Sequence, residues 1–287
     1  MDGQKAAGFP GGRLAGRGHF AVVRQDRGLA LGLVGRFYEC YQNAELFSFM
    51  DGFCRLAGGS LDTFGSLKNG RIVWALAKLG TDEYFPGDPV EKYVLMRNAH
   101  GGPGALEILF TDVRAACENT LSAALEGAGC RVSFSRAASR RLTVGAAEKV
   151  LGHYARHQKS LKEAMRLLVD KRLSGEDMLA MARALTRPVK SGGSRREDED
   201  DAYGGNPPGA VEIIMWLADS GRGTEIPGVR GTAYGFLNAF TEYADHDRRL
   251  SRGRGPAWRE AGFESKLPGA CARLKQDAFD LCLAAAA

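Results

Sequence analysis

The chain has 287 residues, of which 44% are hydrophobic and 25% charged, and its formal net charge is +5 at pH 7. A chain of this length and composition can bury a sizeable apolar core, in one large domain or two smaller ones. No apolar run approaches the roughly 18 residues needed to cross a bilayer, and the N-terminal stretch lacks the apolar region of a secretory signal. We therefore expect a cytoplasmic protein without a membrane partner.

Cysteine spacing and charge distribution indicate which kinds of site and partner to expect. Six cysteines are spread along the chain without a Cys-x-x-Cys pair, so neither a zinc site nor a disulfide framework is expected. The positive charge is concentrated in residues 130–172, which contain 11 basic and 3 acidic residues. This segment would attract a polyanion, or else it is the solvated helix face of a basic protein.

The predicted elements begin after a glycine-rich stretch at residues 1–18, which is expected to be a flexible N-terminal arm. Two β-rich runs, HFAVVRQD and LALGLVGRFYECYQ, are separated by the turn QDRG and predict a hairpin. Asn43 is the expected N-cap of a helix whose apolar residues keep helical spacing up to the pair Gly58-Gly59.

A sheet is predicted to continue after this helix. Asn69-Gly70 lies between two strand-like runs and predicts a two-residue turn with positive φ at one or both residues. VEKYVLMRN and ALEILFTDVRAA then flank GGPG as two more strands, CENTLSAALEGAG follows as a helix, and CRVSFSRA is a candidate for a further strand. Residues 19–140 are thus predicted to form an α+β domain with a largely antiparallel sheet (β-β-α-β-β-β-β-α) backed by helices.

The second half of the chain has the periodicity of helices. Apolar spacing from residue 145 to 173 predicts one long amphipathic helix within a helical segment at residues 141–187. Ser174 is expected to cap the next helix. Residues 188–209 are poor in apolar residues and rich in glycine, proline and charge, which predicts a mobile linker. Residues 210–287 predict an all-helical C-terminal part with three helices.

Sequence motifs of common enzymes are absent: there is no G-x-x-x-x-G-K-[ST], no H-E-x-x-H and no G-x-S-x-G. HGGPG is better explained by a tight turn than by a phosphate loop. His153 and His157 are four residues apart on the long helix but have no acidic or cysteine partner, and Asp245-His246-Asp247 would point in different directions. The sequence therefore assigns no catalytic residue, no metal ligand and no cofactor.

Polar side chains cluster around HGGPG. Arg97, Asn98 and His100 end one predicted strand, and Arg114 and Asn119 lie near the next junction of strand and helix. Because the turn folds one strand back on the other, these groups could converge into a phosphate grip. Alternatively, Asn119 caps a helix and Arg114 pairs with a buried carboxylate of its own strand.

Several separated blocks carry a resemblance to a known family. In chain order they are FAVVRQDRGLALGLVGRFYECYQNAELFSFMD, GSLKNGRIVWALAKL, RNAHGGPGALEILFTDVRAACENTLSAAL, GVRGTAYGFLNAFTEYADHDRR and ARLKQDAFDLCL. They resemble the phage/plasmid-like proteins of the family called domain of unknown function 932, from about His19 to the C-terminus. The family also has an N-terminal segment with a Trp-His-Gly-Leu-Gly-like motif, and this chain begins after it. The resemblance implies a protein of bacterial mobile elements that works on DNA, and it offers no catalytic residues to carry over.

The first functional hypothesis is a single-stranded DNA-binding protein, in particular a strand-annealing recombinase that forms homo-oligomers. The predicted fold is similar to that of single-strand annealing recombinases, with a basic surface for phosphates and aromatic rings for bases. The candidate DNA-binding residues are Lys68, Arg71, Arg97, Asn98, Arg114, Asn119, Arg131, Arg136 and Lys149. The candidates for base stacking are Phe64, Trp74 and Tyr93, although most aromatic residues on strands belong to the core.

Two other hypotheses remain open. A metal-dependent nuclease would need clustered carboxylates, and the dense acids are Asp82-Glu83 with Asp88, and residues 197–201. Nothing in the sequence excludes a non-enzymatic interaction protein, such as an inhibitor of host defence, and DNA binding is the preferred hypothesis.

Overall fold

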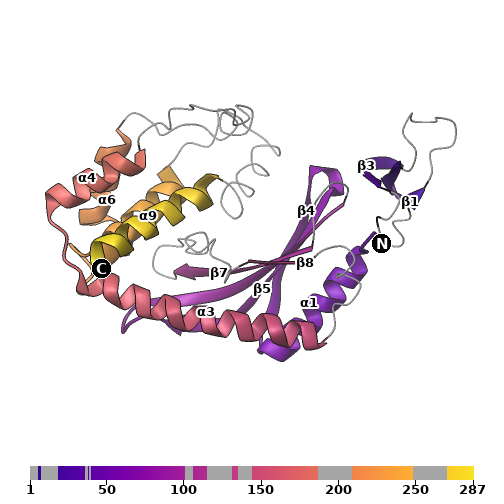
Figure 1. Cartoon of the computed structure of the whole chain (residues 1–287), viewed down its shortest axis with the longest axis horizontal. Coiled ribbons are helices and arrows are strands. Elements are labelled where there is room, and N and C mark those ends of the chain that lie inside the picture. The colour runs from indigo at the N-terminus through magenta and orange to yellow at the C-terminus, as the bar shows by residue number, and fades with distance from the viewer. Residues whose placement is uncertain are drawn as a thin grey trace. The chain divides into compact units, whose positions relative to one another are not determined.

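The computed structural model describes residues 6–7, 19–35, 38, 40–100, 106–114, 131–134, 144–186, 209–247 and 270–287 (Figure 1). Several sequence-based expectations lie outside the described residues: most of the N-terminal arm, the GGPG turn, the helix CENTLSAALEGAG and nearly all of the linker at residues 188–209.

The chain forms two compact units, each assembled from separate stretches of sequence. The first consists of Met1–Gly80, Tyr93–Phe110 and Ala128–Ala155. The second consists of Thr81–Lys92, Thr111–Gly127 and Arg156–Ala287. Each unit is described by itself below, and the domain boundaries expected from the sequence remain a prediction.

The predicted N-terminal hairpin is confirmed. Strands β2 (His19–Arg24) and β3 (Leu29–Gly35) pair antiparallel, and the short strand β1 (Ala6–Ala7) pairs with β2. The turn between β2 and β3 contains Gly28 with φ +60°, a conformation that glycine adopts without steric cost. Val22, Leu31 and Val34 form a small buried cluster in this hairpin.

The predicted first helix is α1 (Asn43–Ala57), which ends at Gly58 in the left-handed conformation. Its N-cap is Gln42, whose backbone N–H donates to the Glu45 carboxylate at 2.6 Å. The expectation that Asn43 is the N-cap is wrong by one residue. Asn43 is the first residue of the helix, and its side-chain oxygen contacts His100 instead of capping.

Five strands form the main sheet, in the order β4-β5-β6-β7-β8. They are β4 (Ser60–Leu67), β5 (Ile72–Glu83), β6 (Pro89–Ala99), β7 (Leu106–Arg114) and β8 (Arg131–Phe134). The pairs β4–β5 and β7–β8 are antiparallel. The candidate strand CRVSFSRA is β8, so the predicted antiparallel sheet is confirmed and has five strands.

The β4–β5 hairpin has the predicted position but a longer turn. Leu67 pairs with Ile72, so four residues connect the strands, and Lys68–Gly70 form a short 3-10 turn, η1. Asn69 and Gly70 have φ of 58° and 93°, which confirms the expected positive φ at both residues. Lys68 also has positive φ, 51°, and the turn is therefore not the two-residue type that the sequence predicted.

One face of the sheet packs against α1 and the first part of helix α3 (Val144–Asp170) (Figure 1). The strand residues that enter this core occupy alternate positions, as expected for strands with one covered face. They are Val73, Ala75, Ala77, Val94, Met96, Leu106, Ile108 and Phe110. Phe110 stacks on Tyr154 of α3 with ring centroids 4.0 Å apart, which anchors the helix to the sheet within the first unit.

The second unit is built around helices. The long helix predicted from residue 145 is α3, and the next helix is α4 (Gly175–Thr186), with Ser174 Oγ accepting from the backbone N–H of Asp177 at 3.1 Å. The three predicted C-terminal helices are α6 (Ala210–Ser220), α7 (Ala233–Glu242) and α9 (Ala270–Ala286). A short 3-10 turn, η4 (Arg222–Thr224), follows α6, and a π-helical turn, η5 (Tyr243–Asp247), extends α7.

The C-terminal helices enclose a buried ion pair between Lys275 of α9 and Asp245 of η5. The Lys275 side chain is fully buried, and a charge in that position requires a partner. The fold is α+β as predicted, with an antiparallel sheet followed by helices. No helix in the described ranges has both the length and the apolar character to cross a membrane.

Candidate nucleic-acid interface

The second face of the sheet carries the residues that bear on nucleic-acid binding. Val73, Val94 and Met96 point into the core beneath α1 and α3. Side chains alternate along a strand, so Trp74, Tyr93 and Arg97 occupy the opposite face. All three side chains are partly exposed there. The structure therefore brings two stacking candidates and one phosphate candidate to a single sheet face.

Trp74 lies across the neighbouring edge strand. Gly65 of β4 pairs with Trp74 of β5, and a Cβ atom added to Gly65 would lie 2.8 Å from Cζ2 of the indole. The absence of a side chain at position 65 therefore lets the aromatic ring approach the β4 backbone. This packing fixes the ring while leaving it partly exposed.

Arg97 has a carboxylate neighbour on the same face. Its guanidinium lies 3.2 Å from Glu107 of β7, and both side chains are largely buried. The alternation that identifies Trp74 also brings Lys78 of β5 to this face. Sequence reasoning missed Lys78, although it lies four residues after Trp74, at the spacing of residues that share a strand face.

Lys68 and Arg71 are exposed in the β4–β5 turn. Arg24 of the N-terminal hairpin contacts this turn. Its guanidinium donates to the backbone oxygen of Asn69 at 3.1 Å and forms an ion pair with Asp26 at 2.7 Å. Lys68 and Arg71 therefore lie exposed on a turn of the first unit that Arg24 holds in place.

Asn98 is buried and faces the opposite way from Arg97. It is 1% exposed, and its side-chain N–H donates to the backbone oxygen of Tyr41 at 3.0 Å. His100 is equally buried. The structure does not bring Arg97 and Asn98 together, because consecutive strand residues point to opposite faces. Their combined role in one solvent-reachable grip remains without structural support.

The other candidate residues are dispersed. Phe64 lies on the α1 side of the sheet, where its ring meets that of Phe47 with centroids 5.4 Å apart. Lys149 is exposed on α3, which covers the same side. Arg114 ends β7, and the backbone of Arg131 pairs with Leu109 of β7. Asn119 and Arg136 lie outside the described residues.

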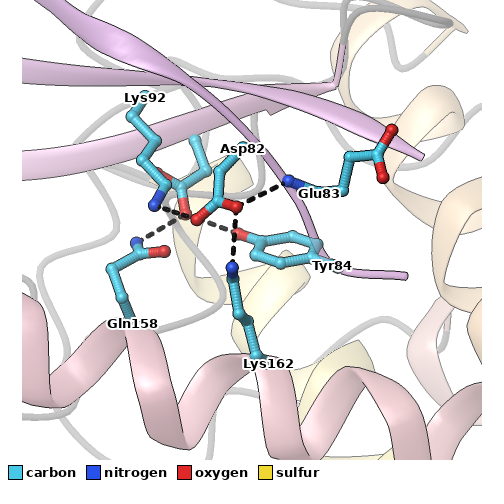
Figure 2. Close-up of polar contacts among 7 residues, drawn as sticks. Asp82, Glu83, Tyr84, Lys92, Gln158 and Lys162 are labelled. Atoms are coloured by element: carbon cyan, nitrogen blue, oxygen red, sulfur yellow. Dashed lines mark hydrogen bonds and ion pairs between the residues drawn. The ribbon is translucent and has the colours of Figure 1, made fainter. Parts of the chain in front are cut away.

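A polar cluster in the second unit joins α3 to the ends of three strands. Figure 2 shows Lys162 pointing from α3 to the carboxylate of Asp82, at 2.7 Å, with Lys92 bonded to the same carboxylate. Burial by itself would raise the pKa of Asp82, but hydrogen bonds from Lys162 and Lys92 outweigh it and hold this pKa well below its usual range. The cluster thus contains a carboxylate that stays ionised between two cations.

A second carboxylate lies beside this cluster. Asp112 of β7 is buried and accepts hydrogen bonds from the Tyr84 hydroxyl and from the Gln158 amide, the latter at 2.7 Å. Both of these donors are neutral groups, as is common for the partners of a buried polar side chain. Sequence reasoning did not identify this cluster, since its members are far apart in the chain.

The acids considered for a nuclease are engaged separately. Asp82 bonds to two lysines, whereas Asp88 is buried and accepts from the Tyr234 hydroxyl. Among the residues that the structure describes, no three His, Cys, Asp or Glu side chains are grouped so as to hold a metal ion. Residues 197–201 fall outside that part of the chain.

These observations define an α+β protein whose antiparallel sheet has one face covered by helices and another face with partly exposed aromatic and cationic residues. The model of the family described as Domain of unknown function (DUF932) matches residues 30–278. The chain belongs to this family, as its sequence blocks indicated. No curated protein and no solved structure matches the chain.

Proposed function

We propose that the chain binds single-stranded DNA on the sheet face opposite α1 and α3. The observation that carries the proposal is the placement of Trp74, Tyr93, Lys78 and Arg97 on the same face of the sheet. Aromatic rings stack on bases of any sequence at about 1–3 kcal/mol per base, while cations attract the phosphates. Single strands are the proposed ligand because their bases are available for stacking.

The phosphate contacts in this proposal come chiefly from lysines and from the hairpin turn. Arg97 already pairs with Glu107, and that carboxylate would repel a phosphate close to it. The proposed phosphate contacts are therefore Lys78 on the sheet face, with Lys68 and Arg71 exposed in the turn. Binding is expected to be salt-dependent, since each phosphate contact releases counterions.

Strand annealing by a homo-oligomer is the finer part of the proposal. Strand β4 is an edge strand, and its residues 60–64 are all exposed. Leu61 and Phe64 are large apolar side chains among them, 46% and 63% exposed. Exposed apolar residues on a sheet edge are typical of surfaces that pair with another chain, here a second copy. The proposed cellular setting is the cytoplasm of a bacterium that carries a mobile element.

Direct binding tests this function. A fluorescein-labelled oligodeoxythymidine is titrated with the full chain at several salt concentrations, with the duplex form of a mixed sequence as competitor. We expect preference for the single strand and a linear fall of log affinity with log salt concentration. Absence of binding at low salt would contradict the proposal and favour a protein partner.

Annealing is tested separately with two complementary dye-labelled strands, followed by energy transfer. Light scattering in the same buffer measures the oligomeric state with and without DNA. Acceleration of annealing together with assembly on DNA is expected. Binding without either effect would keep DNA binding and reject the annealing part.

A further inference from the structure

Cys40, His100 and Asn43 form a connected series of side chains in the first unit. The Sγ atom of Cys40 lies 3.9 Å from Nδ1 of His100, and Nε2 of the same ring lies 2.8 Å from Oδ1 of Asn43. Cys40 precedes α1, Asn43 is the first residue of α1, and His100 directly follows β6. The three residues are 60 positions apart in sequence at most, and only the fold brings them together.

The hydrogen bond to Asn43 determines the tautomer of His100. An amide oxygen only accepts, so Nε2 carries the hydrogen and donates it to Oδ1 of Asn43. The neutral ring then has its lone pair on Nδ1, which faces the thiol of Cys40. With its hydrogen donated to Asn43, Nε2 cannot also accept from the Asn98 amide, which lies 3.4 Å away and donates to the Tyr41 backbone oxygen at 3.0 Å.

The position of the imidazole is fixed by the surrounding backbone. His100 is 1% exposed, and its backbone N–H donates to the Arg71 carbonyl at 2.6 Å. Cys40 is only half-buried, in contrast to the buried thiols of Cys54, Cys271 and Cys282. Cys40 is thus the most exposed of these four cysteines, and its Sγ lies 3.9 Å both from the backbone oxygen of Tyr41 and from Nδ1 of the buried His100.

We propose that Cys40 is a nucleophilic thiol that reacts with small disulfides, with His100 as proton acceptor and Asn43 as the residue that orients the ring. In this reaction the thiol proton passes to Nδ1, and the thiolate attacks one sulfur of the disulfide. A new bond forms between Sγ and that sulfur, and the original disulfide bond breaks. The leaving thiolate takes the proton from the imidazolium, so Cys40 is oxidised to a mixed disulfide and one thiol is released.

The other charged and titratable groups near Cys40 are compatible with this reaction. Glu45 in the first turn of α1 is already bonded to the Gln42 backbone, and the carbonyl of Arg71, the residue before β5, accepts from the His100 backbone N–H. Burial, and secondarily the charge of Glu45, raise the pKa of Tyr41, so its hydroxyl stays neutral. The proposal is independent of DNA binding.

The probe is oxidised glutathione, applied to the full chain and followed by peptide mass spectrometry at Cys40. The matched control is the synthetic peptide RFYECYQNA, which has the same local sequence without His100. An ordinary thiol loses roughly 50- to 100-fold in rate between about pH 8 and about pH 6, because its thiolate fraction falls. We expect a loss of less than about tenfold for Cys40 in the protein and the ordinary loss for the peptide.

Two variants distinguish the role of His100 as proton acceptor from that of Asn43, which orients the ring. Asn43→Asp keeps an acceptor for Nε2 and adds charge, so it is expected to preserve the flat pH profile, whereas His100→Gln is expected to restore the ordinary one. If His100→Gln does not fold, the comparison of the native chain with the peptide decides. A native profile as steep as that of the peptide, or no modification of Cys40 in the folded chain, would overturn the proposal.

Discussion

The indole of Trp74 lies against the backbone of Gly65 on the neighbouring strand, at a distance that leaves no room for a methyl group. A Cβ atom at Gly65 would be 2.8 Å from Cζ2 and 3.1 Å from Cε2 of the ring. The conformation of this tryptophan, which is central to the proposed DNA surface, therefore depends on a residue of the edge strand.

Gly65→Ala should displace the indole of Trp74. We expect a loss of about 1–3 kcal/mol in the free energy of unfolding, because the added methyl overpacks the site, and a shift in tryptophan emission. Urea unfolding and fluorescence check both. Gly52→Ala in α1 is the matched control, since no atom lies within 4 Å of its added Cβ and alanine favours helix. Equal unfolding midpoints for the two variants would show that Trp74 does not pack as described.

Lys68→Gly should weaken DNA binding without lowering the stability of the fold. Lys68 has φ 51°, a conformation that costs a side chain about 1 kcal/mol and glycine little. The variant should therefore be as stable as the native chain or more so, yet its log–log salt slope for DNA should fall by about 0.7 if a phosphate contact is lost. Asn69→Gly, which removes no charge from the same turn, should bind normally. An unchanged slope for Lys68→Gly would remove this lysine from the interface.

Asp82→Asn should lower stability in a pH-dependent way. The pKa of Asp82 is lowered in the folded state, so its stabilising effect is complete above the unfolded value of about 4 and is lost as pH falls through the folded value. We expect the free energy of unfolding of the variant to be lower by about 1–2 kcal/mol near neutral pH, because the two ion pairs of Asp82 are partly exposed. The difference from the native chain should shrink at about pH 3. A constant difference across this range would contradict the ion pairing with Lys92 and Lys162.

Period-two and helical patterns were sufficient to predict most of the fold. The strand alternation around Val73 and Val94, and the Gly58 stop of α1, are local properties that a sequence displays directly. The N-cap at Gln42 and the four-residue turn at residues 68–71 were mispredicted. In both places, a tertiary contact competes with the local preference: His100 engages Asn43, and Arg24 holds the turn.

The candidate site was harder to predict because sheet faces depend on which side the helices cover. Arg97 and Asn98 are adjacent in sequence, yet one is partly exposed on the face opposite α1 and α3 and the other is buried. The same alternation could have identified Lys78 once the core positions of β5 were known. Contacts such as Asp82 with Lys162 join residues 80 positions apart and leave no local pattern.

The most direct measurement of the central claim is the affinity of a labelled oligodeoxythymidine for three leucine variants of the full chain. Trp74→Leu and Tyr93→Leu keep an apolar side chain but remove the ring that stacks, whereas Phe49→Leu makes the same change in α1, away from the proposed surface. Circular dichroism and urea unfolding establish that each variant is folded. The account predicts that Trp74→Leu and Tyr93→Leu each raise Kd by at least about fivefold, equivalent to about 1 kcal/mol of lost stacking, while Phe49→Leu does not. Equal Kd values for Trp74→Leu, Tyr93→Leu and the native chain would contradict it.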